Sequence, residues 1–239
     1  MRLRIRFRKY GPVRYIGHLD VMRFFQKAIR RAEIDVAYTN GFSPHQIMAF
    51  AAPLGVGITS NGEYMDIEVH SITCCQDVLE RLNQACVPGI EIISVRILPE
   101  TAGNAMASVA AASYTVRFRE DRMPATDIST ILPGFLEKEH ILTAKKTKNG
   151  TREIDLKQGI FNLEYSDSEG LFHMTVDASS GGNIRPGQVI EAILAEAGEK
   201  PAENALLITR EDVYTKVVAE GEERLISLEN VGYTEGELP

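Results

Sequence analysis

The chain has 239 residues, of which 26 are Lys or Arg and 33 are Asp or Glu, giving a formal net charge of −7 at pH 7. With 44% hydrophobic and 25% charged residues, its composition is that of a folded soluble protein and excludes wholesale disorder. No apolar run reaches the ~18–20 residues of a membrane span. The N-terminus alternates charged with apolar residues, unlike a secretory signal. We therefore expect a cytoplasmic protein with no membrane contact, built as one large or two small domains.

The first half of the chain predicts alternating strands and helices. Arg2 to Arg8 alternate with apolar residues, as in a half-buried strand. From Leu19 to about Ile34 apolar residues recur every three or four positions, which predicts an amphipathic helix. In chain order, the other expected elements are an extended segment at 46–52, a strand at 65–69 after an Asn61-Gly62 turn, a helix at about 76–86 and a strand at 90–98.

That order predicts a ferredoxin-like arrangement, βαββαβ. The second half repeats it with an extra strand or hairpin. Its expected strands are 114–119, 140–146, 154–156, 160–165, 171–177 and 205–209, and its expected helices are 127–132 and 186–197. We therefore predict an α+β fold of two tandem ferredoxin-like halves, at 1–98 and 113–210, with a linker at 99–112 and a loose acidic tail at 211–239.

Charge is distributed unevenly along the chain. The first 50 residues hold ten basic and three acidic side chains, a net +7, so the remaining 189 residues carry −14. The predicted first helix bears a basic stripe on one side, at Arg23, Lys27, Arg30 and Arg31. Such a stripe suits a polyanion, although two oppositely charged parts of a chain can also neutralise each other.

The first strand adds a second group of basic residues. Arg4 and Arg6 are expected on the sheet face opposite the helices, together with Asp66 and Glu68 of a neighbouring strand. Cross-strand ion pairs are one interpretation of this face. The other is an open, arginine-bearing sheet that contacts a phosphate backbone.

Two polar loops flank the predicted first helix. Arg14 and His18 precede it, and Ser43 and His45 follow it. Either histidine could act as a general acid or base near neutral pH, but loops at opposite ends of a helix do not favour a catalytic pair. In the second half, Lys145 and Lys146 belong to a basic hairpin tip, and Arg185 opens the last helix, where backbone N–H groups can receive an anion.

The three cysteines, Cys74, Cys75 and Cys86, show no Cys-x-x-Cys spacing. Their odd number and spacing disfavour a disulfide framework, a zinc site or an iron–sulfur site. We expect no metal and no cofactor in this chain.

The blocks Gly17-His18-Leu19-Asp20, Gly41-Phe42-Ser43-Pro44-His45 and Pro53-Leu54-Gly55-Val56-Gly57 resemble those of an uncharacterised family of radical-SAM-linked proteins. The resemblance covers about residues 1–210, with Lys145-Lys146 and Asn183-Ile184-Arg185-Pro186 as its later anchors. It implies a radical-SAM enzyme as a separate partner chain, because this chain lacks the Cys-x-x-x-Cys-x-x-Cys cluster motif. It also implies a context of tRNA or rRNA modification. The expected architecture is similar to that of CRISPR repeat-processing proteins and some pseudouridine synthases, which is an analogy of fold only.

These observations lead us to expect a non-enzymatic accessory protein that binds structured RNA and a radical-SAM partner. Arg14, His18, Arg23, Lys27, Arg30 and Arg31 would contact phosphate, with Ser43 and His45 beside them. One alternative is a metal-independent RNA-processing enzyme that uses His18 or His45 as general acid/base. Another is a protein–protein adaptor for the radical-SAM partner.

Overall fold

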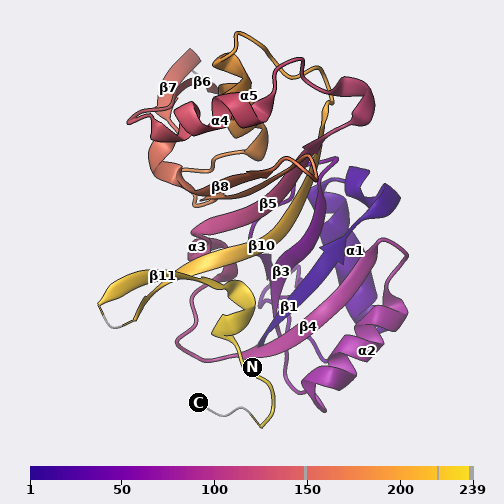
Figure 1. The fold of residues 1–239 in the computed structure, drawn as a ribbon. Coiled ribbons are helices and arrows are strands. Elements are labelled where there is room, and N and C mark those ends of the chain that lie inside the picture. The colour runs from indigo at the N-terminus through magenta and orange to yellow at the C-terminus, as the bar shows by residue number, and fades with distance from the viewer. Residues whose placement is uncertain (148–149, 220, 237–239) are drawn as a thin grey trace. The chain divides into compact units, whose positions relative to one another are not determined.

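The computed structural model describes residues 1–147, 150–219 and 221–236. The chain has an α+β fold with mostly antiparallel strands and few helices (Figure 1). It divides into two compact units: unit 1 comprises 1–110 with 210–239, and unit 2 comprises 111–209. The finer prediction of two tandem ferredoxin-like halves is not confirmed. In the described residues, no helix has the length and hydropathy needed to cross a bilayer.

Unit 1 is built on an antiparallel sheet in which β4, β1, β3 and β10 are neighbours in that order. Strand β2 pairs with β3, and β11 pairs with β10. Its strands are β1 (Arg2–Lys9), β2 (Met48–Phe50), β3 (Thr59–Glu68), β4 (Ile90–Leu98), β10 (Leu206–Ala219, from Arg210 onward) and β11 (Glu222–Ser227). Its helices are α1 (His18–Arg31), α2 (Cys75–Ala85), α3 (Ala105–Ser108) and the short 3-10 turns η1 (Gly11–Tyr15) and η4 (Leu228–Val231).

The period-two pattern of β1 places its apolar residues in the core of unit 1. Leu3, Ile5 and Phe7 are 0–1% exposed. Phe7 packs edge-on against Phe25 of α1, with ring centroids 4.7 Å apart. The predictions for this strand and for the amphipathic helix are confirmed, since hydrophobic burial favours one apolar face on each element.

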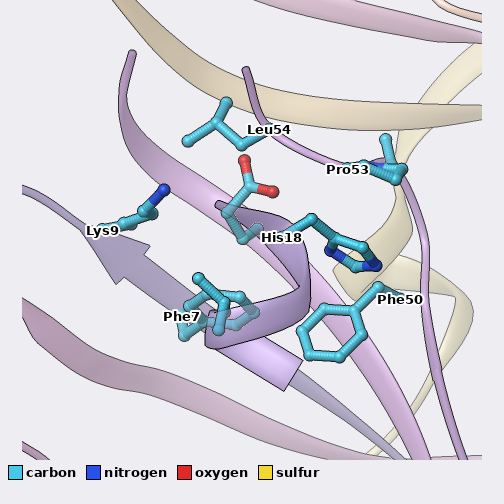
Figure 2. Close-up of a pocket in the computed structure, with 9 residues that line it drawn as sticks. Phe7, Lys9, His18, Phe50, Pro53 and Leu54 are labelled. Carbon is cyan, nitrogen blue, oxygen red and sulfur yellow. The ribbon is translucent and has the colours of Figure 1, made fainter. Parts of the chain in front are cut away.

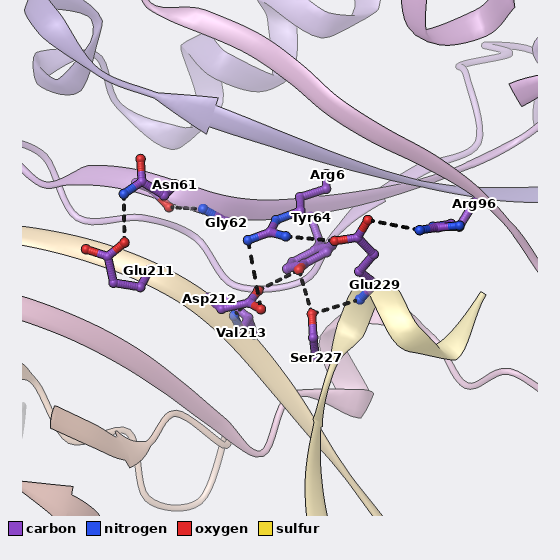
Figure 3. A network of polar contacts seen from close by, with 11 residues as sticks. Arg6, Asn61, Gly62, Tyr64, Arg96, Glu211, Asp212, Val213, Ser227 and Glu229 are labelled. Atoms are coloured by element: carbon purple, nitrogen blue, oxygen red, sulfur yellow. Dashed lines mark hydrogen bonds and ion pairs between the residues drawn. The ribbon is translucent and has the colours of Figure 1, made fainter. Parts of the chain in front are cut away.

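The opposite face of β1 is not an open basic surface. Arg4 is 1% exposed and donates to both carboxylate oxygens of Asp66 at 2.8 and 2.9 Å. Arg6 donates to Glu229 at 2.7 Å, in a network that also includes Asp212 and Arg96 (Figure 3). The ion-pair interpretation of this face is therefore correct, and the interpretation as an open phosphate-binding sheet is wrong.

The carboxylate partners of Arg6, and the Leu228 carbonyl that accepts from Arg4, come from the segment expected to be a loose tail. From Arg210 to Ala219 the chain forms β10, followed by β11 and η4, and Leu228 is fully buried. The tail is ordered because its acidic residues neutralise arginines of the sheet and its few apolar residues enter the core. The expected linker at 99–112 also contains structure: α3 lies within it, with Ala105 fully buried, and the next strand begins at Ala111.

The prediction of a turn at Asn61-Gly62 is wrong, because both residues lie inside β3. Gly62 is buried where β3 passes close to β10. A Cβ atom at Gly62 would stand 2.6 Å from the carbonyl oxygen of Glu211. The glycine is there for close approach of two backbones and not for a turn.

Unit 2 has a three-stranded antiparallel sheet in the order β5-β9-β8, and a separate hairpin of β6 and β7. Its strands are β5 (Ala111–Phe118), β6 (Leu142–Thr147), β7 (Gly150–Asp155), β8 (Ile160–Ser166) and β9 (Leu171–Asp177), and residues 206–209 of β10 also belong to it. Its helices are α4 (Ile128–Glu137), α5 (Pro186–Ala195) and the 3-10 turns η2 (Glu120–Arg122) and η3 (Lys157–Gly159). Helix α4 continues through Pro133, past the predicted end, because Phe135 is buried in the core.

Candidate nucleic-acid interface

The basic stripe of α1 lies on the side of the helix that faces away from the core. Val21, Phe25, Ala28 and Ile29 are buried, and this fixes the rotation of the helix. The stripe consists of Arg23, Lys27, Arg30 and Arg31. All four residues are exposed to solvent. The stripe therefore remains accessible in the folded chain.

One acidic side chain pairs with this stripe in the described contacts. Arg23 lies 3.2 Å from Asp20, and the two side chains are 67% and 62% exposed. An ion pair this exposed contributes about 0–1 kcal/mol and is screened by salt. Arg30 and Arg31 donate to backbone carbonyls, of Gln26 at 3.2 Å and of Ala85 at 2.8 Å, which fixes their position without removing their charge.

The loop from Tyr38 to Gln46, hereafter the 38–46 loop, is attached to the same helix. Backbone pairing closes its base, with the Thr39 N–H donating to the His45 carbonyl at 2.9 Å. The Gln46 amide then donates to the Gln26 carbonyl at 3.2 Å, the same oxygen that accepts from Arg30. The base of the loop therefore lies against α1, next to Arg30 of the basic stripe.

Ser43 and His45 lie in this loop and are exposed. The His45 Nδ1 is 3.0 Å from the Thr39 hydroxyl, so this imidazole helps to hold the loop closed. Two aromatic residues of this loop are not among the predicted site residues: Phe42, whose side chain is fully exposed at the loop tip, and Tyr38, which is 46% exposed. The signal that could have found Phe42 was a lone aromatic between Asn-Gly and Ser-Pro, with no apolar periodicity to place it in a core.

Arg14 lies in η1, just before α1, and is half-buried. Its guanidinium donates to the Tyr15 hydroxyl at 2.7 Å and lies 4.8 Å from the centroid of the Tyr15 ring. Tyr15 is itself 57% exposed. This pair adds a cation and an aromatic ring to the region around the N-terminus of α1.

His18 lines a small pocket of unit 1 together with Phe50, Pro53, Leu54 and Lys9 (Figure 2). Its imidazole packs edge-on against Phe50, with ring centroids 5.1 Å apart. Burial, and then the charge of Lys9, lower the pKa of His18 below its ordinary value. The cavity volume is about 10 Å³, which is enough for about one water molecule.

Two of the side chains that line this pocket, Lys9 and Glu63, are charged and buried. Lys9 is 2% exposed and donates to the Ile16 carbonyl at 2.8 Å. Glu63 accepts from Arg210 at 3.0 Å, and both of these side chains are 7% exposed. Burial raises the pKa of Glu63, while the nearby Arg210 and Lys9 charges oppose that rise. The pairing keeps the β1–β3–β10 region together, because removing one partner would leave a buried unpaired charge.

The structure gives the two candidate catalytic histidines separate surroundings. His18 begins α1, while the loop that carries His45 contacts the helix at Gln26, about 12 Å further along its axis. Among the described side-chain contacts, none joins the two imidazoles. The arrangement does not favour a joint acid–base role for the two histidines.

The candidates in unit 2 lie apart in the sequence from those of unit 1. Lys145 and Lys146 belong to β6, but their side chains lie outside the described residues. Arg185 is the exposed N-cap residue of α5, and its backbone N–H donates to Gln188 at 3.0 Å. That bond satisfies part of the helix start without any ligand.

Neither the cysteines nor the carboxylates offer a metal site in the part of the chain that the structure describes. No group of three or more His, Cys, Asp or Glu side chains there could hold a metal ion. Burial, with Glu235 adding to it, raises the pKa of Cys75 to about 12, and burial raises that of Cys86 to about 11. Cys74 caps α2 by accepting from the Asp77 N–H at 3.3 Å. The Cys75 and Cys86 thiols therefore remain protonated at neutral pH.

A family model matches most of the chain, over residues 2–186. The chain belongs to the family described as "Uncharacterized protein conserved in bacteria (DUF2344)". This membership agrees with the expected uncharacterised family, but its description contains no link to radical-SAM proteins. No curated protein matches the chain.

One solved structure with some likeness is titled "Crystal Structure of a Cbf5-Nop10-Gar1 Complex", with a TM-score of 0.48 and 11% sequence identity. The match covers 88% of this chain and 48% of that chain, so this chain spans about half of the other's length. A likeness of this degree adds nothing to the assignment of fold or function.

Proposed function

We propose that this protein is an accessory RNA-binding protein of the cytoplasm that works with a radical-SAM enzyme in tRNA or rRNA modification. In this proposal each unit is a ferredoxin-like half, and unit 1 provides the principal RNA contact. The observation that carries the proposal is the outward-facing stripe of Arg23, Lys27 and Arg30, in a chain whose overall charge is −7.

The distribution of charge supports a polyanionic ligand. Arg4 and Arg6 of β1 pair with carboxylates and stabilise the fold, whereas the arginines of α1 face solvent. Like charges spaced three or four residues apart slightly destabilise an isolated helix. Binding to phosphates converts that cost into affinity, because condensed counterions are released from the nucleic acid.

The test is RNA binding by the triple variant Arg23→Ala/Lys27→Ala/Arg30→Ala. We expect RNA affinity to fall steeply, and the slope of log affinity against log salt to decrease by about 2, at about 0.7 for each lost phosphate contact with a single strand. Fluorescence anisotropy over a salt series measures both quantities.

The matched control is the triple variant Lys138→Ala/Lys216→Ala/Arg224→Ala. It removes three exposed basic side chains that pair with carboxylates outside α1. This variant has the same net charge and should keep its affinity and its salt slope. Equal losses in both variants would show non-specific attraction and contradict the proposal.

The radical-SAM partner should co-purify with the chain after nuclease treatment.

A further inference from the structure

We infer that the stripe of α1 and the 38–46 loop together bind unpaired RNA, with the ring of Phe42 stacking on a base. The inference rests on the proposed function and specifies which form of RNA the surface takes. Its starting observation is a solvent-exposed aromatic ring on a loop whose base contacts the helix that bears the basic stripe.

The exposure of Phe42 has no explanation in the fold. Its side chain is 108% exposed relative to a reference chain, so the ring gains nothing from burial when the protein folds. The loop around it is nevertheless well tied, by the backbone bond from Thr39 to His45 and the pairing of Tyr38 with Gln46. A closed loop that holds a large apolar ring in water suits a partner that covers the ring.

The ring lies within reach of the cations. Gln46 and Arg30 donate to the same carbonyl oxygen, that of Gln26, so the base of the loop lies beside the centre of the stripe. Phe42 is four residues before Gln46, and four extended residues span at most about 14 Å. A strand of a few nucleotides can therefore place phosphates on Arg30 and Lys27 and a base on Phe42.

Charge alone does not distinguish among polyanions, but the ring does. In an A-form duplex the bases are stacked on one another, and side chains reach mainly phosphates and 2′-hydroxyls. In a single strand each base has an accessible face, and stacking on an aromatic side chain tolerates any sequence. The carboxylates of an acidic protein could engage the stripe, but they have no aromatic face to stack on the Phe42 ring. The combination of cations and a free ring therefore favours unpaired RNA.

The experiment compares a mixed-sequence RNA of about 12 nucleotides with the same strand annealed to its complement, by fluorescence anisotropy at one salt concentration. The wild-type protein should bind the single strand more tightly. Phe42→Ala should weaken single-strand binding by about 5- to 150-fold and change duplex binding by less than about 2-fold. Phe42→Tyr should restore most of the affinity, because tyrosine keeps the ring.

Val56→Ala is the matched control, since Val56 is an exposed apolar loop residue of unit 1 that lacks a ring. It should leave both affinities unchanged. Equal binding of strand and duplex, with no effect of Phe42→Ala, would overturn this inference and leave the proposed function standing. Absence of binding to either RNA would overturn both. Binding of poly-glutamate as tightly as RNA, with the same loss in Phe42→Ala, would identify an acidic protein partner and overturn the inference.

Discussion

At the scale of single residues, some arginines of unit 1 are buried in ion pairs and others are exposed on the surface of α1. Arg4 donates to both oxygens of Asp66 and to the Leu228 carbonyl, and its side chain is almost completely buried. Arg23 and Arg30 instead make exposed contacts on the outer face of α1. A buried, fully paired arginine is part of the fold, because removing its partner would leave an unpaired charge in the interior. Arg23 and Arg30 of the helix therefore remain available to a ligand.

The pKa of His18 provides a prediction at this scale. Burial and the Lys9 charge lower that pKa below 6.5, so the folded state binds fewer protons than the unfolded state just below pH 6.5. The free energy of unfolding should therefore fall as the pH drops from 6.5 toward the folded-state pKa. In the RNA-processing alternative, a neutral His18 imidazole at pH 7 would suit a general base and not a general acid.

An NMR titration of the imidazole protons measures this pKa directly. Lys9→Met removes the second cause of the shift while keeping the length of the side chain, so the pKa should rise toward 6.5. Lys27→Met removes a charge from the exposed face of α1 and serves as the control. A wild-type pKa at or above 6.5, or no change in Lys9→Met, would contradict this explanation.

At the scale of elements, the contact between β3 and β10 joins parts of the chain that are far apart in sequence. Tyr64 of β3 donates to Asp212 at 2.5 Å, and Asn61 donates to Glu211 at 2.7 Å (Figure 3). Gly62 lies between these two residues, where any side chain would meet the backbone of β10. The absence of a side chain at Gly62 is therefore part of how the strands fit.

Gly62→Ala tests this contact. The new Cβ would lie 2.6 Å from the Glu211 carbonyl oxygen and 2.9 Å from the Asp212 Cα, both backbone atoms that cannot move aside easily. We expect the free energy of unfolding to fall by about 1–3 kcal/mol, as in overpacked cores. Urea denaturation measures the change.

Gly134→Ala is the control for this prediction, because Gly134 lies in α4 and a Cβ added there would meet open space, with no neighbouring heavy atom within 4 Å. Replacing a helical glycine with alanine should be neutral or stabilising, by up to about 1 kcal/mol. A loss in Gly134→Ala as large as that in Gly62→Ala would show that the close approach is not the cause.

At the scale of the whole molecule, unit 1 is discontinuous. Its chain leaves at Ala110 and returns at Arg210, and residues 111–209 form unit 2. The returning segment supplies β10, β11 and the carboxylate of Glu229, which pairs with Arg6 and Arg96. Unit 1 is therefore complete only when both ends of the chain are present.

Unit 1 should consequently fold when residues 111–209 are replaced by a short Gly/Ser linker. The Ala110 N–H donates to the Tyr214 carbonyl at 2.8 Å, so Ala110 lies next to Tyr214. The linker must therefore span about the length of the four residues that separate Tyr214 from Arg210. We expect one cooperative urea transition with a smaller slope than the full chain, since less surface becomes exposed on unfolding. Residues 1–110 alone should lack that transition. Equal stability of the two shortened chains would contradict the discontinuous unit.

The amino-acid sequence by itself determined the elements whose pattern is local. Period-two alternation predicts β1, and helical periodicity predicts α1 together with its basic stripe, because both depend on residues only a few positions apart. Tertiary structure alone decided what neutralises Arg6, that Gly62 lies in a strand, and that Phe42 remains in water. The reason is physical: the partners of Arg6 and Tyr64 lie about 150 to 220 positions away, and no local pattern encodes contacts that form only when distant strands pair.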